Sequence, residues 1–479
     1  MWRSNEDLLF LIFEELGNDK KSLYSCLLVN RTWCVTAVSI LWRNPSLFSY
    51  FGIQKKLFNV ILLLLSEESK EILKNQGMNN FITETTHQRP LFNYMSFWKH
   101  LKLPILRHEI FSNIVGESNA PILRNELFKL FINKNTKFIQ LTITEYFDYQ
   151  VHLIPGAECC LSGLEIFYYN SKIDPNVLVG LAKICKSIKK IEINFDSYEN
   201  TDSHGIFKLI EVQKNLNEFY LTDAFNRLEP FYKYLEESLI KHADTIQYLK
   251  IDWSPNTRFL SYFVNLVYLE IEKSFFIKKY NPNNLKNISL PILKILKINR
   301  VPLIATVNLI ESTTGNLSEI SIHCDKALRD VGCKMLIQAI YQNCPNIRYL
   351  KLSFDIKLLI PEFKNLLINC KFLIGLIIHV RNDYNFRWNK LFQILAKSSP
   401  ISLFKFKFYS KEFKLKDLKL FFDNWKNRRA MLLKIIYPSF KVDQQLVSLI
   451  EQYKAKGIIE NYIFSIIDCG DDYENFKWI

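Results

Sequence analysis

The stretch IKKIEINFDSYENTDSHGIFKLIEVQKNLNEFYL, residues 188–221, decides the fold. It begins and ends with the same six-residue pattern, apolar-x-x-apolar-x-apolar, first as IKKIEI and then as LNEFYL. Apolar residues that alternate with a period of two predict a short strand. The residues between the two copies suffice for a helix of about two to three turns. The stretch therefore predicts a strand, a turn, a helix and the next strand.

The same pattern recurs from residue 138 almost to the end of the chain, at intervals of 20 to 30 residues. Its other copies begin at Phe138, Leu161, Ile246, Leu266, Leu293, Leu317, Ile347, Leu373, Ile401 and, more loosely, Ala430, and Ile459 and Phe464 mark a last degenerate copy. Alternation of strand and helix at this period is typical of leucine-rich repeats. Such repeats stack into a curved α/β solenoid lined by a parallel sheet, and this is the fold that we expect.

The first 45 residues predict three short helices. In the first helix, apolar residues recur at i, i+3, i+4 and i+7, at Leu9, Ile12, Phe13 and Leu16. The next two helices carry the apolar residues Leu23, Cys26, Leu27 and Val29, and then Trp33, Ala37, Ile40, Leu41 and Trp42. So small a module cannot bury all of this surface, so part of it must face another molecule or the rest of the chain.

This stretch resembles an F-box, the module by which adaptor proteins dock on the Skp subunit of a cullin-RING (SCF) ubiquitin ligase. The residues that match the family pattern are Asp7, Leu8, Leu9, Ile12, Phe13, Leu16, Val29, Arg31, Trp33, Leu41 and Trp42. The pattern departs at its start, where Ser4 and Asn5 replace Leu-Pro, which weakens one contact expected in the family. The resemblance implies that a Skp-type adaptor, and through it a cullin, binds at Leu8, Leu9, Ile12, Phe13, Leu16, Val29, Trp33, Leu41 and Trp42.

The sequence thus divides into an F-box at 1–45, a helical linker region at 46–135 and a solenoid of about 12 to 13 leucine-rich repeats at 136–479. In the linker, residues 57–76 predict a helix that is broken near Ser66, and residues 91–115 predict shorter helices. The longest apolar run, Val60 to Leu65, is too short to span a bilayer, and the first residues do not form a signal peptide. We therefore expect a chain of the cytoplasm, the nucleus or both, with no membrane association.

Neither an enzyme nor a metal protein is predicted. The ten cysteines form no CxxC pair, and no phosphate loop, nucleophile elbow or zinc-protease motif is present. Cys185, Cys344 and Cys370 each precede a strand copy by three residues, which resembles the cysteine-containing repeats that often accompany F-boxes. We expect these three to be equivalent core positions, and we expect a non-catalytic protein without a cofactor.

The fifth residue of each copy is expected to point out from the sheet. This row reads Thr142, Glu165, Glu192, Tyr220, Lys250, Glu270, Lys297, Ser321, Lys351, Ile377, Lys405 and Lys434, and it passes from acidic to basic. A graded face of this kind suits an acidic or phosphorylated target protein. The candidate contacts are Tyr220, Lys250, Lys297, Arg348, Lys351, Lys405, Lys407 and Lys434. Alternatively, these lysines bind no target and only make the exposed face of the sheet soluble.

The leading hypothesis is a substrate-recognition adaptor of an SCF-type ubiquitin ligase. A second is a non-degradative scaffold in which the N-terminal helices cap the first repeat. A third is a nucleic-acid-binding solenoid, because residues 390–441 carry a net charge of +10 and contain Phe404, Phe406, Phe408 and Tyr409. Phe404 and Phe406 are expected to point into the core, which weighs against stacking on bases.

Overall fold

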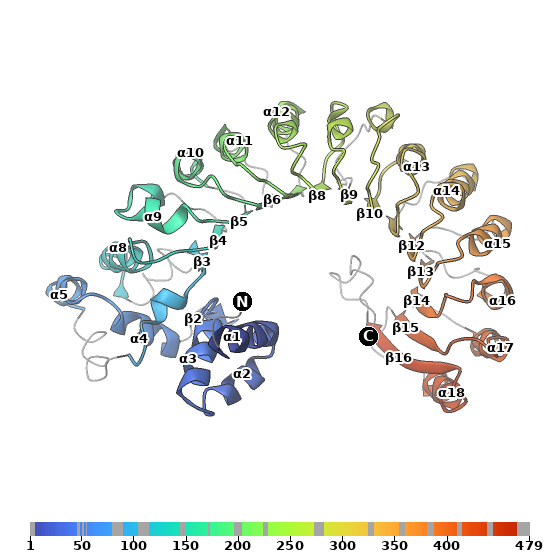
Figure 1. Cartoon of the computed structure of the whole chain (residues 1–479), viewed down its shortest axis with the longest axis horizontal. Helices are drawn as coiled ribbons and strands as arrows, with labels where there is room; N and C mark the ends of the chain where they lie inside the picture. The colour runs from blue at the N-terminus through green and yellow to red at the C-terminus, as the bar shows by residue number, and fades with distance from the viewer. Residues whose placement is uncertain are drawn as a thin grey trace. The chain divides into compact units, whose positions relative to one another are not determined.

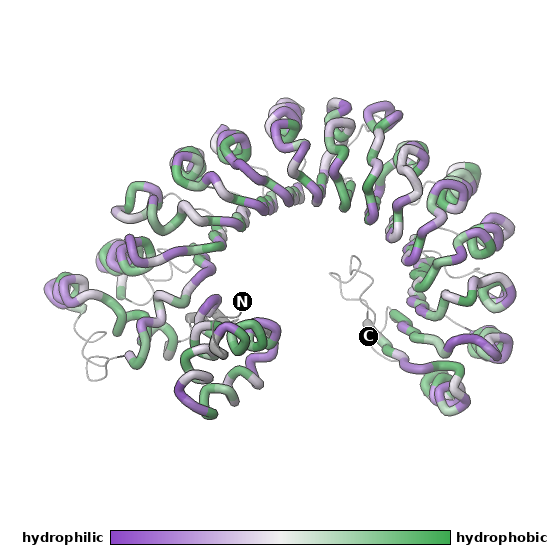
Figure 2. Tube along the Cα trace, in the orientation of Figure 1, coloured by the Kyte–Doolittle hydropathy of each residue, from purple (hydrophilic) through white to green (hydrophobic). Residues whose placement is uncertain are grey.

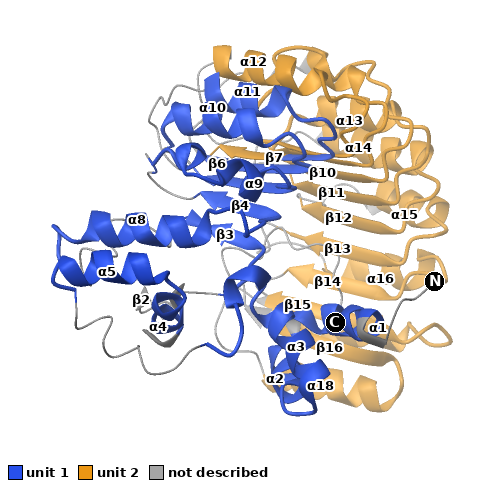
Figure 3. Cartoon of the chain, turned by 60° about the vertical axis from the view of Figure 1, so that its left-hand side comes forward, with its two compact units in different colours: residues 1–219 blue, residues 220–479 orange. Residues whose placement is uncertain are grey.

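The computed structural model describes residues 5–45, 48–49, 52–53, 55–78, 90–103, 115–143, 147, 149–170, 173–195, 204–223, 229–272, 282–323, 330–353, 360–380, 388–409, 414–437 and 444–466. The chain divides into two compact units, Met1–Phe219 and Tyr220–Ile479 (Figure 3). Each unit is built from strand–helix repeats, and unit 1 also contains the N-terminal helices (Figure 1).

Unit 1 begins with the three predicted helices. They are α1 (Asn5–Glu15), followed by the 3-10 turn η1 (Leu16–Asn18), α2 (Lys20–Cys26) and α3 (Arg31–Leu41). Asp19 caps α2 and Asn30 caps α3, each through a side-chain oxygen that accepts a backbone N–H three residues ahead. An antiparallel pair follows, β1 (Phe48–Ser49) and β2 (Gly52–Ile53), and then α4 (Lys55–Leu63) and α5 (Glu67–Asn75). The predicted break is confirmed, because Ser66 is the N-cap of α5.

The repeats of unit 1 start earlier than the sequence pattern suggested. Their elements are η2 (Tyr94–Phe97), β3 (His100–Lys102), α8 (Ala120–Phe131), β4 (Gln140–Ile143), η4 (Val151–Leu153), α9 (Ala157–Leu161), β5 (Ile166–Asn170), α10 (Pro175–Ile184), β6 (Lys190–Phe195) and α11 (His204–Glu211). The expectation of helix at 100–102 is wrong, because β3 pairs in parallel with β4. Residues 98–103, WKHLKL, are a copy of the repeat pattern that we had not recognised. The strands β3, β4, β5 and β6 then pair in chain order.

The boundary between the units falls in β7 (Glu218–Asp223). The elements of unit 2 after it are α12 (Glu229–Ile240), β8 (Tyr248–Ile251), η5 (Phe259–Tyr262), β9 (Tyr268–Glu272), η6 (Pro282–Leu285), β10 (Ile295–Asn299), α13 (Leu303–Glu311), β11 (Glu319–His323), α14 (Asp330–Asn343), β12 (Tyr349–Ser353), α15 (Ile360–Asn369), β13 (Gly375–His379), α16 (Trp388–Ser398), β14 (Lys405–Tyr409), α17 (Leu415–Asp423), β15 (Met431–Tyr437), α18 (Gln444–Ala455) and β16 (Ile459–Ile466). All strands from β8 to β16 are parallel and pair in chain order. A 3-10 turn, η5, replaces the expected helix in the shortest interval, where too few residues remain for full helical turns.

One backbone arrangement links most successive repeats of the described chain. The carbonyl of the second residue of a copy accepts the N–H groups of the second and third residues of the next copy. In unit 1, for example, the Ile139 carbonyl accepts from Glu165 and Ile166 at 2.8 and 3.0 Å. In unit 2 the Arg348 carbonyl accepts from Ile374 and Gly375 at 2.7 and 3.0 Å. This regular register satisfies the strand backbone and fixes the spacing of successive repeats.

The core of each unit lies between its strands and its helices. Along most strands, buried apolar residues alternate with partly exposed residues, and the helices carry both hydrophobic and hydrophilic residues (Figure 2). Cys185, Cys344 and Cys370 are fully buried, which confirms them as core positions of the repeat. Burial raises the pKa of each of these thiols to about 12. The architecture is thus an α/β solenoid of leucine-rich type, as predicted.

Two copies of the pattern were aligned wrongly. Thr142 pairs with Tyr168, so the second copy begins at Leu164, and Glu165 lies outside the fifth-position row. Ile377 pairs with Lys407, so the copy near residue 401 begins at Leu403, and Lys407 replaces Lys405 in the row. Both errors arise because an additional apolar residue upstream offers a second match, and only backbone pairing decides between the two registers.

Candidate functional site: the three-helix module and the sheet face

The three N-terminal helices form a module with a core of its own. Phe13, Leu23, Cys26, Ala37 and Ile40 are buried together, and Phe13 meets the Trp33 ring edge-on at 5.2 Å. Arg43 joins α1 from the far end of α3 through an ion pair with Glu14 at 2.7 Å. The interior of the module is therefore filled from within the chain.

Eight of the nine residues implied by the F-box resemblance fall into three groups. Phe13 lies in the interior, so its side chain is not part of the module's surface. Four are partly buried against the core, namely Leu9, Leu16, Trp33 and Leu41. Three are exposed, Leu8 and Ile12 by 50% and Val29 by 55%. Leu8 and Ile12 are four residues apart and share one face of α1, so they form a common apolar strip.

Trp42, the last of these residues, packs inside unit 1. Its ring stacks on Tyr94, with a centroid distance of 4.1 Å. Beside it, the Arg43 carbonyl accepts the N–H groups of Lys99 and His100 at 2.9 and 3.2 Å. In the same way, one carbonyl of a repeat accepts two successive N–H groups of the next repeat. The chain after α3 therefore occupies the place of a preceding strand for β3, and attaches the module to the first repeat.

Four exposed apolar residues of the module escaped the sequence reasoning: Leu11, Tyr24, Leu28 and Val35. The most exposed is Leu28, at 89%. A usable signal was present for Leu11, because residues 8–13 are six consecutive apolar residues. A helix buries only one face against its own module, so a run of six apolar residues leaves some of their side chains exposed to solvent.

The sheet face of unit 2 differs from the predicted gradient. From β8 to β15 its fifth-position row reads Lys250, Glu270, Lys297, Ser321, Lys351, Ile377, Lys407 and Lys434. In unit 1 the row reads Lys102, Thr142, Tyr168 and Glu192, so it does not begin with acidic residues as expected. The predicted progression from acidic to basic is therefore wrong.

The basic residues predicted to contact a target also differ in how far their side chains are exposed. Lys351 and Lys407 are buried, with 6% and 4% of their surface exposed, and the Lys407 ammonium lies 5.3 Å from the centroid of the Tyr409 ring. Arg348 is exposed, whereas Lys405 and Lys434 are half-buried. The Lys405 ammonium lies 6.0 Å from the centroid of Tyr349. These residues do not form one exposed basic surface.

Ion pairs compensate the charges at the beginning of the row. Lys250 lies 2.9 Å from Glu270 and 3.7 Å from Glu272. Burial disfavours the charge on Lys250, but the two carboxylates outweigh it and raise the pKa of Lys250. The Lys297 ammonium lies 5.3 Å from the Tyr268 ring centroid, and Tyr220 packs near the same ring at 6.5 Å. This part of the face combines aromatic and paired charged groups.

A second polar row lies two residues beyond the first. It contains Glu272, Asn299, His323, Ser353, His379 and Tyr409, which the register places side by side, and Asp252 directly follows β8. Asn299 donates to Glu272 at 2.6 Å, and Ser353 hydrogen-bonds the His379 ring at 3.0 Å. In the described part of the chain, no group of His, Cys, Asp and Glu could hold a metal ion.

Asp252 is the most perturbed carboxyl of this row. It is buried, its Oδ2 accepts the Asp223 N–H at 3.0 Å, and its Oδ1 has no partner among the described residues. Burial and, after it, the nearby Glu272 carboxylate raise the pKa of Asp252 to about 8, although the hydrogen bond from the Asp223 N–H and the charge of Lys250 lower it. The carboxyl is therefore largely protonated at neutral pH.

The aromatic residues of the basic segment 390–441 do not form a stacking platform. Phe404, Phe406, Phe408 and Tyr409 are all buried. The inward positions of this copy belong to Phe406 and Phe408 rather than to Phe404 and Phe406, because the copy starts at Leu403. Phe404 is instead covered by the Arg429 guanidinium, 3.5 Å from its ring centroid.

Comparisons with known proteins give likenesses of fold only. No family model and no curated protein matches the sequence. A chain of the yeast Rad7–Elc1 complex is similar in structure, with 15% sequence identity, 86% of this chain and 96% of that chain covered, and a TM-score of 0.42. The leucine-rich repeat-containing protein LegL7 from Legionella pneumophila is similar at 11% identity, with 69% and 94% covered and a TM-score of 0.32. Both scores are below 0.5, so the repeat architecture is established here by strand order and register alone.

No described helix has the length and apolar character needed to cross a membrane.

Proposed function

We propose that this chain is a substrate-recognition adaptor of an SCF-type ubiquitin ligase. The three-helix module would dock on a Skp-type adaptor, and the repeats would bind a target protein for ubiquitination. The observation that supports this most strongly is that the module has a complete core and still exposes Leu8, Ile12, Leu28 and Val29. Exposed apolar side chains that cluster in one module mark an interaction surface.

The attachment of the module to the repeats also suits an adaptor. Trp42 and the Arg43 carbonyl connect the end of α3 directly to the region of β3. An adaptor that catalyses nothing acts by holding its target near the charged ubiquitin-conjugating enzyme at high effective concentration. A short and well-packed connection limits the volume through which the bound target moves, and so raises that concentration.

The docking test uses residues whose replacement leaves the core intact. Ile12→Glu combined with Val29→Glu places two charges on the exposed surface of the module, and it should abolish co-purification of the Skp adaptor. Ile401→Glu is the matched control, because Ile401 is 86% exposed and lies in unit 2. Circular dichroism should give the same melting curve for all three proteins. Undiminished binding by the double variant would exclude this docking surface.

Attachment of the module to β3 equally favours a second function, a scaffold whose helices cap the first repeat. In that case the wild-type chain would bind no Skp adaptor even at about 10 µM, a concentration that detects moderate affinities. Removal of residues 1–45 would then lower the melting temperature of the remainder without loss of any partner. Direct titration of purified Skp adaptor into the full chain distinguishes the two functions.

A further inference from the structure

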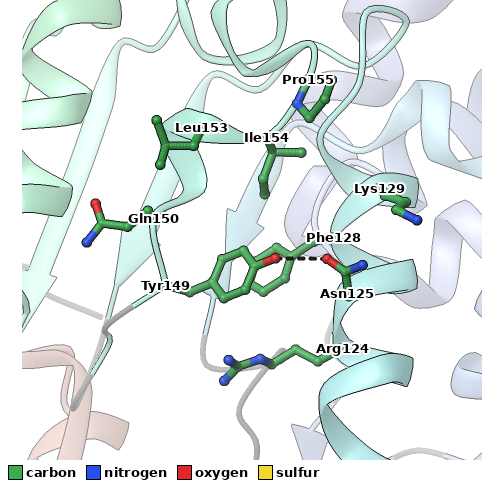
Figure 4. A pocket seen from close by; sticks show the side chains of 9 residues that line it. All are labelled: Arg124, Asn125, Phe128, Lys129, Tyr149, Gln150, Leu153, Ile154 and Pro155. Atoms are coloured by element: carbon green, nitrogen blue, oxygen red, sulfur yellow. Dashed lines mark hydrogen bonds between the residues drawn. The ribbon is translucent and has the colours of Figure 1, made fainter.

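A pocket of about 450 Å³ lies on unit 1, between α8 and the segment 149–155 (Figure 4). It is separate in sequence from the three-helix module and does not include any of the sheet-face residues predicted to bind a target. Volumes of this order are typical of binding sites that enclose a small ligand or a few residues of a peptide.

The floor of the pocket is rigid and aromatic. Tyr149 stacks on the buried ring of Phe128, with the centroids 4.2 Å apart and the planes 9° from parallel. The Tyr149 hydroxyl donates to Asn125 Oδ1 at 2.9 Å, which fixes the orientation of the ring. The Arg124 guanidinium lies 5.0 Å from the centroid of Tyr149, and this cation–π contact holds it at the edge of the pocket.

An aliphatic wall formed by Leu153, Ile154 and Pro155 stands on the opposite side of the Tyr149 ring (Figure 4). Leu153 is 71% exposed, so most of its side chain is open to a ligand. The wall ends at Gly156, whose φ of +93° suits glycine, and a Cβ there would lie 2.7 Å from the Asn133 carbonyl carbon. This close approach holds the segment in place, so the pocket is formed before any ligand arrives.

The charges around the pocket are not balanced. Lys129 pairs with Glu126 at 2.6 Å, and the other oxygen of that buried carboxylate accepts the Ser69 hydroxyl at 2.6 Å. Arg124, by contrast, has no ion-pair partner within the described residues, so the pocket carries one uncompensated cation. The guanidinium fork is well suited to two parallel hydrogen bonds with a carboxylate.

We propose that this pocket binds an acidic peptide segment, which places a carboxylate on Arg124 and a neighbouring aliphatic side chain against Leu153, Ile154 and Pro155. Charge complementarity selects the carboxylate, and the exposed aliphatic wall selects the second side chain. The proposal does not depend on docking of a Skp adaptor, because no residue is shared between the two surfaces.

The test measures the fluorescence anisotropy of a fluorescein-labelled peptide, Gly-Glu-Leu-Glu-Leu-Glu-Gly, titrated with the full chain. Saturable binding is expected, together with weaker binding of the peptide in which Gln replaces each Glu. Arg124→Gln should weaken binding of the acidic peptide at least about tenfold, as expected for the loss of a charge-assisted pair. Leu153→Gln should weaken it as well, and because Leu153 is exposed this variant should fold normally. Arg124→Glu should reverse the preference toward a Lys-containing peptide.

The matched control is Lys137→Gln, which removes one exposed cation of unit 1 outside the pocket and should change the affinity less than about twofold. Three results would overturn the proposal. The first is no saturable binding below about 1 mM, the weak end of specific affinity. The second is equal loss of affinity in Arg124→Gln and Lys137→Gln. The third is displacement of the peptide by equimolar inorganic phosphate, since the aliphatic wall would then contribute nothing.

Discussion

Replacement of Asp252 by Asn should make unit 2 more stable at alkaline pH. The Asp252 carboxyl is buried and its pKa is raised from 3.8 to about 8, first by burial and then by Glu272. Asn has nearly the same shape and keeps an oxygen that accepts the Asp223 N–H. It does not ionise, so the variant isolates the effect of the buried charge.

The direction in which Asp252 changes the free energy of unfolding with pH follows from which state of the chain holds its proton. Between about pH 4 and about pH 8 the unfolded chain has released the proton of Asp252 while the folded chain still holds it. The contribution of Asp252 to stability is therefore fully present below about pH 4, and it is lost as the pH rises through about 8. The gap between 3.8 and about 8 corresponds to about 5 to 6 kcal/mol, at about 1.4 kcal/mol for each tenfold change in proton affinity. This is an upper bound, because local relaxation and water penetration lower the penalty, and a gain of about 2 kcal/mol or more is expected above pH 8.

The assay is urea unfolding of wild type and Asp252→Asn at about pH 4.5 and about pH 8.5. The difference in unfolding free energy should grow with pH in favour of the variant. Asp19→Asn is a control whose effect should not change between these two pH values, because hydrogen bonds from the Ser22 hydroxyl and backbone lower the pKa of the exposed Asp19 and its carboxyl is ionised at both. The stability that Asp19 contributes is present above its ordinary pKa and is lost as the pH falls. A difference for Asp252→Asn that is flat or declines with pH would refute the reasoning.

Three further predictions concern single contacts. Asn30→Ala removes the side-chain oxygen that accepts the Trp33 N–H at 2.9 Å, and it should lower the stability of the module by about 1 kcal/mol in thermal unfolding, whereas Asn30→Ser should restore most of it. Alkylation of the native chain at about pH 8 should modify the exposed Cys159 and leave Cys344 intact, because burial raises the pKa of Cys344 to about 12. Equal modification of the two cysteines in mass spectrometry would contradict this. Gly180→Ala should destabilise unit 1 by about 1 to 3 kcal/mol, because the added Cβ would lie 2.1 Å from the His152 ring. Adding His152→Ala should recover part of the lost stability, and no recovery would show that the clash with His152 is not the cause.

Most of the architecture could be predicted from residue periodicity. The strand pattern placed β4, β6 to β13 and β15, and the burial of Cys185, Cys344 and Cys370 was expected because each occupies the same position in its repeat. The strand at 100–102 was missed because the WKHLKL copy contains Trp and is followed by Pro104, which favoured an interpretation as short helices. A short apolar segment is compatible with either element, and in this case pairing with β4 decided it.

The candidate docking surface was predicted less completely. The F-box pattern identified which residues are apolar, but not which of them fill the module. Phe13 and Ile12 are neighbours in the same helix, yet one is enclosed and the other is half exposed. The stacking of Trp42 on Tyr94 joins residues 52 positions apart, and no local pattern contains such a contact.

The sequence by itself determined that this chain is a series of strand–helix repeats preceded by a small helical module. It could do so because side-chain periodicity depends only on local backbone geometry, which repeats every two residues in a strand. Only the tertiary structure decided which lysine stands in each row, which lysine pairs with Glu270 and Glu272, and that Arg124 and an aliphatic wall line the same pocket. These are properties of residues brought together from separate repeats, and they depend on hydrogen-bond register and burial, which no single segment specifies.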